Sequence, residues 1–152
     1  MYEIVQVIND YFDIALLLIV LYSSIMWFWF LDDEPQINNA SFRFFLNLEV
    51  AVSATILVLG IIAISYNVSS LSKGWVQFKA ILTIMSTATI ALNRLKTKKY
   101  LESNLDKNAH KKINFLRVVV IGLIMTNYTL TEVSKARENP EIQQEIKEKF
   151  KK

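Results

Sequence analysis

One apolar stretch, residues 75–94, holds side chains that could bind an ion or a small ligand within a membrane. It carries a lysine in its interior and an arginine at its end, and at helical spacing its polar side chains recur along one face. That face, which we call the lysine face, consists of Lys79, Thr83, Ser86, Ile90 and Asn93. An ionisable group that faced lipid would cost about 2.5–3.5 kcal/mol on insertion scales, so we expect the lysine face to lie against protein or water.

Depth along antiparallel helices decides which charged group can meet Lys79. Asp13 lies near the start of the first apolar stretch and Asn127 near the end of the fourth, which places both at the depth of Lys79. Glu49 differs from Lys79 in depth by roughly ten residues, or about 15 Å at 1.5 Å per residue. We therefore predict that Lys79 faces the bundle interior and lies nearer Asp13 or Asn127 than Glu49.

A second ion pair is predicted near the opposite end of the helices from Lys79. Glu49 lies inside the second stretch, and we predict that it pairs with Arg117 or Arg94 at the same depth. Such charges can merely hold helices together or reach toward the interface, but ionisable residues deep in a membrane are functional candidates. Ser53 and Gly60 share the helix face of Glu49, and their small side chains predict close approach of a neighbouring helix.

The sequence holds few groups for metal, haem or covalent chemistry. It has no cysteine and one histidine, which excludes a disulfide, a thiolate nucleophile and bis-histidine haem ligation within one chain. The histidine, His110, lies in a lysine-rich segment where we expect it to be solvated. Met85 and Met125 can reach mid-membrane depth, and thioethers bind Cu(I), but methionines in apolar helices are usually core filler. We therefore predict no bound cofactor, no catalytic residue and no enzyme activity.

Four apolar runs must position these residues. Hydrophobic residues make up 53% of the 152-residue chain and charged residues 20%, and the two kinds are segregated along it. Each run is near the ~17–25 residues that a helix needs to cross the ~30 Å hydrocarbon layer. The runs are residues 11–31, 44–65, 75–92 and 113–130. They predict an all-α fold, an integral membrane four-helix up-down bundle with a short charged C-terminal helix.

The runs also predict the domain organisation. Residues 1–131 form a four-span membrane domain, and residues 132–152 form a C-terminal charged tail helix. Ile142, Ile146 and Phe150 fall on one side of this tail helix. The tail therefore either lies on the membrane surface or meets a partner.

Residues at the ends of the runs predict how the chain lies in the membrane. The aromatic cluster at residues 27–30 predicts an anchor at head-group level, with a ligand platform as the less favoured alternative. Basic residues close to the spans concentrate in the third loop, residues 96–112, so we expect this loop in the cytoplasm and both termini outside. Because the basic residues flank apolar runs, the net charge of +3 does not indicate a nucleic-acid partner.

Residues that flank the second and third runs follow a recognisable order. An Arg precedes an apolar helix that ends in a Gly-containing turn, a Lys-containing helix follows, and an Asn-Arg pair closes it. These residues are Arg43, Gly60, Gly74, Lys79, Asn93 and Arg94. The order resembles the membrane domain of the copper-resistance protein D (CopD) family over residues 41–130, which implies copper movement across a bacterial inner membrane. The histidine and methionine-rich stretches of that family are missing here. The related HemJ-like protoporphyrinogen oxidases bind haem through intramembrane histidines that this chain lacks, so haem is not implied.

Two functional hypotheses follow. The first is a small polytopic membrane protein of CopD-like type that handles an ion or small ligand at the lysine face, linked to copper by resemblance only. The alternative is a non-catalytic accessory or assembly subunit of a larger membrane complex, which docks through the third loop and the C-terminal tail. Both hypotheses expect the lipid bilayer as a partner. The second hypothesis also expects other membrane subunits.

Overall fold

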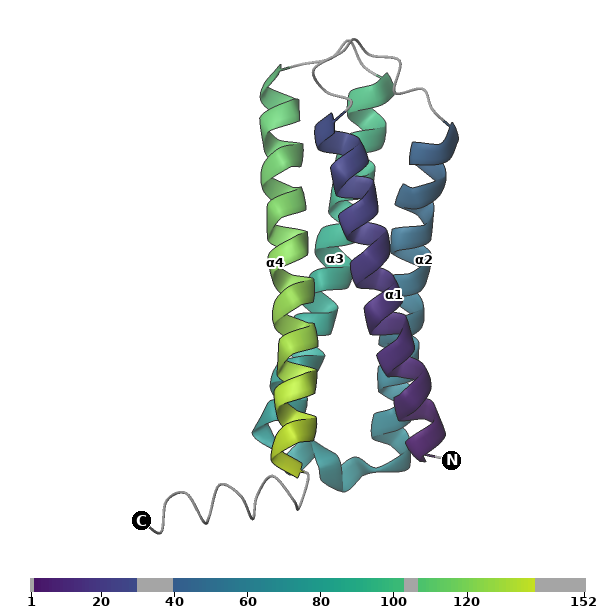
Figure 1. Ribbon diagram of the computed structural model, residues 1–152, viewed down its shortest axis with the longest axis vertical. Coiled ribbons are helices and arrows are strands. Elements are labelled where there is room, and N and C mark those ends of the chain that lie inside the picture. The colour runs from purple at the N-terminus through teal and green to yellow at the C-terminus, as the bar shows by residue number, and fades with distance from the viewer. Residues whose placement is uncertain (1, 30–39, 103–106, 139–152) are drawn as a thin grey trace, which may run out of the picture.

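The computed structural model of the protein describes residues 2–29, 40–102 and 107–138, and these residues are almost entirely helical (Figure 1). The elements in chain order are α1 (Tyr2–Trp29), α2 (Ala40–Tyr66), the short 3₁₀-helix η1 (Val68–Ser72), α3 (Gly74–Glu102) and α4 (Lys107–Glu138). Both prolines, Pro35 and Pro140, lie outside these helices, so no proline interrupts their backbone hydrogen bonds. The prediction of an all-α fold is confirmed.

The four α-helices form an up-down bundle in which each helix packs beside two others (Figure 1). Both α1 and α3 contact α2 and α4, so α1 faces α3 across one diagonal of the bundle, and α2 faces α4 across the other. The start of α1, the helix η1 and the end of α4 lie at one end, the terminal end. The opposite end, where α1 finishes and α2 begins, is the loop end. The predicted up-down bundle is therefore confirmed.

The helices are longer than the hydrocarbon layer of a bilayer. They contain 28, 27, 29 and 32 residues. At 1.5 Å per residue these lengths are about 40–48 Å, against ~30 Å of hydrocarbon. The stretches that are long and apolar enough to cross a membrane are Val7–Phe28, Phe42–Tyr66, Gly74–Leu101 and Asn108–Ser134. The chain is a multi-pass membrane protein with four candidate spans.

In this bundle apolar side chains cover the outside and charged side chains lie inside, which is the opposite of a water-soluble bundle. Large apolar side chains such as Leu18, Ile81 and Val118 are exposed on the outer faces. The charged side chains of Glu49 and Arg117 are each only 1% exposed. An apolar surface of this extent would drive association in water, whereas in a bilayer it is the surface that lipid covers. The outer faces of the bundle therefore contact lipid, and polar groups meet one another inside.

The C-terminal tail predicted as a charged helix, with Ile142, Ile146 and Phe150, lies outside the described residues. Part of the third loop also lies outside them. The predicted domain boundary at residue 131 falls within α4, which continues to Glu138. The accessory-subunit hypothesis depends on docking through these segments, so it stays a prediction.

Candidate functional site

The lysine face of α3 points into the bundle. Ser86 and Asn93 are buried there, and the ammonium of Lys79 meets α1 across the bundle diagonal. Lys79 Nζ donates a hydrogen bond to Asp13 Oδ2 at 3.4 Å, and the two side chains are 18% and 7% exposed. The predicted pairing with Asp13 is confirmed, and Glu49 pairs elsewhere. An ion pair thus joins two helices that do not pack side by side.

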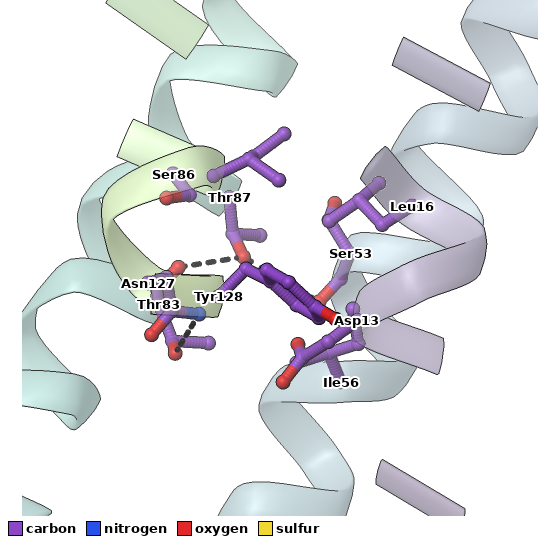
Figure 2. Close-up of a pocket in the computed structure, with 10 residues that line it drawn as sticks. Asp13, Leu16, Ser53, Ile56, Thr83, Ser86, Thr87, Asn127 and Tyr128 are labelled. Carbon is purple, nitrogen blue, oxygen red and sulfur yellow. Dashed lines mark hydrogen bonds between the residues drawn. The ribbon is translucent and has the colours of Figure 1, made fainter. Parts of the chain in front are cut away.

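Polar side chains from all four helices surround Asp13 at this depth (Figure 2). Asn127 Nδ2 on α4 donates to Thr83 Oγ1 on α3 at 3.4 Å. Thr87 Oγ1 on α3 donates to the backbone carbonyl of Ser53 on α2, also at 3.4 Å. Together with apolar neighbours these residues line a cavity of about 10 Å³, which is close to the volume that one water molecule needs. We call the polar group the Asp13 layer; it consists of Asp13, Ser53, Thr83, Ser86, Thr87, Asn127 and Tyr128.

A larger opening, the α2–α3 groove, lies beside Lys79. Its volume is about 290 Å³, at the lower end of the ~300–1,000 Å³ typical of small-molecule pockets. Apolar side chains of α2 and α3 form most of its wall, from Ile64 and Trp75 near the terminal end to Ile56 and Ile84 deeper in the membrane. Lys79 lines this groove, and Asp13 lines the small cavity. Ile56 and Thr83 line both spaces, so the polar cavity and the apolar groove adjoin near the ion pair.

Gly60 lies in the wall of the groove, and its surroundings correct one prediction. The spacing of small residues on α2 predicts close approach of a neighbouring helix at both Ser53 and Gly60. At Ser53 the backbone carbonyl does accept a hydrogen bond from Thr87 of α3. At Gly60, however, a Cβ atom would find nothing within 4 Å. The prediction is wrong at Gly60, because α2 and α3 leave the groove open there instead of closing on it.

Two polar groups in the groove retain hydrogen-bonding capacity. An ammonium has three N–H donors, and the hydrogen bond from Lys79 to Asp13 uses one of them. Asn9 of α1 is 9% exposed and also lines the groove. Among the described residues, its Oδ1 atom is buried with no hydrogen-bond partner. Buried polar atoms are rarely left unpaired without a reason. Asn9, Lys79 and Thr83 give the mostly apolar groove its polar lining.

Glu49 and Arg117 form a second ion pair, which crosses the other diagonal, from α2 to α4. Arg117 Nη1 lies 3.6 Å from Glu49 Oε1. The same nitrogen donates to Ser23 Oγ and Ser24 Oγ of α1, each at 3.1 Å, and Ser23 Oγ donates to Glu49 Oε1. Of the two predicted partners of Glu49, Arg117 is the one present. A buried charge needs both a partner and further hydrogen bonds. Nη1 of Arg117 finds them on α1 and α2, whereas Nε and Nη2 are buried without a hydrogen-bond partner among the described residues.

The predicted site residues divide between two depths. Asn93 lies 14 residues beyond Lys79 on α3, which is roughly 21 Å at 1.5 Å per residue. Arg94 Nε donates to Asn47 Oδ1 of α2 at 2.8 Å rather than to Glu49. The residues that come together at the small cavity are Asp13, Thr83, Ser86 and Asn127, and Lys79 joins them through its ion pair with Asp13. The remaining polar candidates, which lie in the half of the bundle nearer the loop end, are Glu49, Asn93, Arg94 and Arg117.

A buried aromatic cluster near the loop end is absent from the sequence-based predictions. Trp27 is fully buried, and its ring stacks on Phe42 and His110 at centroid distances of 5.6 and 5.7 Å. Tyr100 meets the Trp27 ring edge-on at 5.9 Å, and Trp27 Nε1 donates to Asn114 Oδ1 at 2.7 Å. The prediction of a head-group anchor is wrong for Trp27, which is fully buried. His110, predicted to be solvated, is half-buried, and its Nε2 is buried without a hydrogen-bond partner among the described residues. The Trp27 ring covers the buried guanidinium of Arg117. The His110 ring stacks on Trp27.

The methionines considered for Cu(I) are not buried in the bundle. Met85 and Met125 are 50% and 52% exposed on the outer surface. Among the described residues, no three His, Asp or Glu side chains gather as a metal site. The inward-facing groups are hydroxyls, amides and ion pairs, which suit an organic ligand or a hard cation better than a soft metal.

Neither a scan against protein-family models, nor a search of curated proteins, nor a search of solved structures finds a match. The class of this protein is therefore inferred from its fold and candidate site alone. It is a four-span membrane protein whose helices are joined across both diagonals by intramembrane ion pairs.

Proposed function

We propose that this four-span membrane protein binds a small ligand at Lys79, which the ligand reaches from the lipid through the α2–α3 groove. One observation carries the proposal: an ammonium group within a membrane span lines an apolar groove of about 290 Å³. Intramembrane ionisable residues mark ligand or ion sites by default. Of an ion and a small ligand, the groove favours the ligand, because it has a volume of about 290 Å³ and a mostly apolar wall.

The polar groups of the groove narrow the ligand to an alkyl-chain carboxylic acid. Its carbonyl oxygen accepts a hydrogen bond from Lys79. Its hydroxyl donates one to Asn9 Oδ1, which is buried without a partner among the described residues and turns toward the groove when the ligand binds. A neutral acid adds no charge to the Lys79–Asp13 pair, which keeps its hydrogen bond. The alkyl chain lies against Ile56 and Ile64.

The resemblance to the CopD family supports a ligand site on α3, because the lysine-containing helix is part of the shared pattern. We propose a bacterial inner-membrane location on the same ground. The copper function of that family is not part of the proposal, since the two candidate thioether ligands face outward.

The groove can be filled without disturbing the helices. Gly60→Leu places a side chain where a Cβ meets nothing within 4 Å, and leucine is a better helix former than glycine. Trp75 also lines the groove and reports on it by fluorescence, whereas Trp27 and Trp29 lie at the loop end. We expect a fatty acid brominated on its chain to quench Trp75 saturably in detergent. In Gly60→Leu the binding should be at least tenfold weaker, which corresponds to about 1.4 kcal/mol.

Gly122→Leu is the matched control. Gly122 lies on α4, a Cβ there also meets nothing within 4 Å, and it does not line the groove. We expect this variant to bind the brominated acid as the unaltered protein does, and we expect the methyl ester and the alkylamine of the same chain length to bind more weakly. Equal binding by the Gly60 and Gly122 variants would contradict the site, and equal binding of the alkylamine would contradict the head group.

Copper and haem provide a further prediction. We expect protein purified in detergent and dialysed to retain neither copper nor haem in stoichiometric amount, because the described residues offer no cluster of metal-ligating side chains. Metal analysis and visible absorbance check this. Retained copper that Met85→Leu or Met125→Leu removes would show that the outward thioethers form a site after all.

A further inference from the structure

A second recess lies between α2 and α3, at the loop end, and its lining is strongly basic. It has a volume of about 220 Å³. Its lining residues are Arg43, Leu46, Asn47, Arg94, Lys98 and Leu101. Three of the six are cations and none is an acid. We call it the basic recess, and we propose that it binds the phosphate of an anionic phospholipid.

The arrangement of the cations suits a phosphate. Arg94 Nε donates to Asn47 Oδ1 at 2.8 Å, which holds the half-buried guanidinium between the two helices. That bond uses Nε, and a guanidinium fork can offer its Nη groups to phosphate oxygens in a bidentate contact. Arg43 enters from the first turn of α2 and Lys98 from the last turns of α3. Arg94, which its hydrogen bond to Asn47 holds in place, and two further cations therefore lie around one small volume. One of these cations, Lys98, also keeps a contact of its own within the protein.

The position of the recess selects a lipid rather than a soluble phosphate. Arg43 is the second residue of the span Phe42–Tyr66, and Leu101 is the last residue of the span Gly74–Leu101. The recess thus lies at the boundary of the hydrocarbon layer, where phospholipid phosphates lie. Basic pockets between transmembrane helices bind anionic head groups. Leu46 and Leu101 give the recess an apolar side, and the exposed rings and chains beside it, such as Phe44 and Leu95, give an acyl chain its contact surface.

The basic recess is independent of the ligand site at Lys79. Both open along the α2–α3 interface, but no residue lines both. The recess occupies the loop end and the groove the terminal end of that interface. A lipid in the recess would hold α2 and α3 together at the end where the groove does not separate them. Failure of one proposal leaves the other standing.

The test measures lipid binding to the full chain in detergent by native mass spectrometry. We expect the unaltered protein to retain one phosphatidylglycerol in preference to phosphatidylcholine by at least tenfold. The triple variant Arg43→Gln/Arg94→Gln/Lys98→Gln should lose that preference. The control Lys96→Gln/Lys111→Gln/Lys112→Gln removes the same charge near the same end of the bundle without touching the recess, and it should keep the preference.

Three results would overturn the proposal. Equal losses in the triple variant and in the control would mean that charge alone attracts the lipid. Equal retention of phosphatidylcholine would mean that no phosphate charge is recognised. Displacement of the lipid by millimolar inorganic phosphate would mean that the recess takes phosphate from solution. If the triple variant folds poorly, the single substitution Arg43→Gln at an exposed side chain replaces it, with a several-fold loss of preference expected and an unchanged preference contradicting the site.

Discussion

Glu49→Leu is expected to lower the free energy of unfolding by about 3–5 kcal/mol, because removing one member of a buried ion pair leaves the other charge unpaired. Arg117 would keep only the hydroxyls of Ser23 and Ser24 as hydrogen-bond partners among the described residues. Its side chain is 1% exposed, so the guanidinium cannot reach water without disrupting the bundle. The measurement is unfolding in mixed micelles followed by circular dichroism.

The double variant Glu49→Leu/Arg117→Met decides whether the unpaired charge is the cause. Replacing a whole buried ion pair by apolar side chains of similar volume is often neutral or stabilising. Ser23 keeps a partner in the double variant, because its one hydroxyl hydrogen can be donated to the Val20 carbonyl, 3.1 Å away, once Glu49 is gone. We therefore expect the double variant to recover most of the stability that either single variant loses. If it is as unstable as the single variants, the side chains act through their shape and packing rather than through charge.

Trp27→Ala is expected to lower the free energy of unfolding by about 3 kcal/mol, the low end of the range for removing a large buried aromatic side chain. The low end applies because lipid already solvates apolar groups, so the loss comes from the cavity and the missing contacts. Those contacts are the stacked rings of Phe42 and His110, the edge of Tyr100 and the hydrogen bond to Asn114. Thermal unfolding in detergent measures the difference.

Two companion variants separate the contributions of Trp27. Trp27→Phe keeps a ring for stacking but loses the indole N–H, so we expect a loss of about 1 kcal/mol from the missing hydrogen bond. Phe28→Ala is the control at the neighbouring position, where the ring is 42% exposed on the outer face. It should change stability little. A loss in Phe28→Ala equal to that in Trp27→Ala would mean that both rings act at the lipid interface, as the sequence alone suggests.

The depth of each charge could be predicted from the sequence. A helix rises 1.5 Å per residue, so once the spans are placed, the position of a residue in its span fixes its height. This is why Lys79 is matched with Asp13 and not with Glu49, and why Arg117 meets Glu49. The inward direction of the lysine face follows from the same regular geometry, because residues three and four apart share a face.

The sequence also indicates which face of α1 is turned toward the bundle interior, although its aromatic composition suggests a different orientation for Trp27. Val20, Ser23, Ser24 and Trp27 are spaced as one helical face, and all four are buried. Composition alone assigns tryptophan near a span end to the head-group layer. The spacing from two serines, which must face a polar interior, is the signal that places Trp27 inside.

The α2–α3 groove could not be predicted, because it depends on how two helix axes diverge. Small residues such as Gly60 permit close approach but do not enforce it. Whether the axes meet or separate is set by larger side chains elsewhere along the pair and by the short connection through η1. The orphaned Oδ1 of Asn9 is likewise a property of the assembled bundle, not of its own helix.

The two diagonal ion pairs also constrain how the protein is made. Both acidic members, Asp13 and Glu49, lie on the first two helices, and both basic members, Lys79 and Arg117, lie on the last two. During synthesis the first hairpin, which carries both carboxyl groups, therefore enters the membrane before Lys79 and Arg117, the basic members of the two pairs, are inserted. Each hairpin is incomplete alone and complementary to the other, so the two halves expressed as separate polypeptides should find each other in the same membrane.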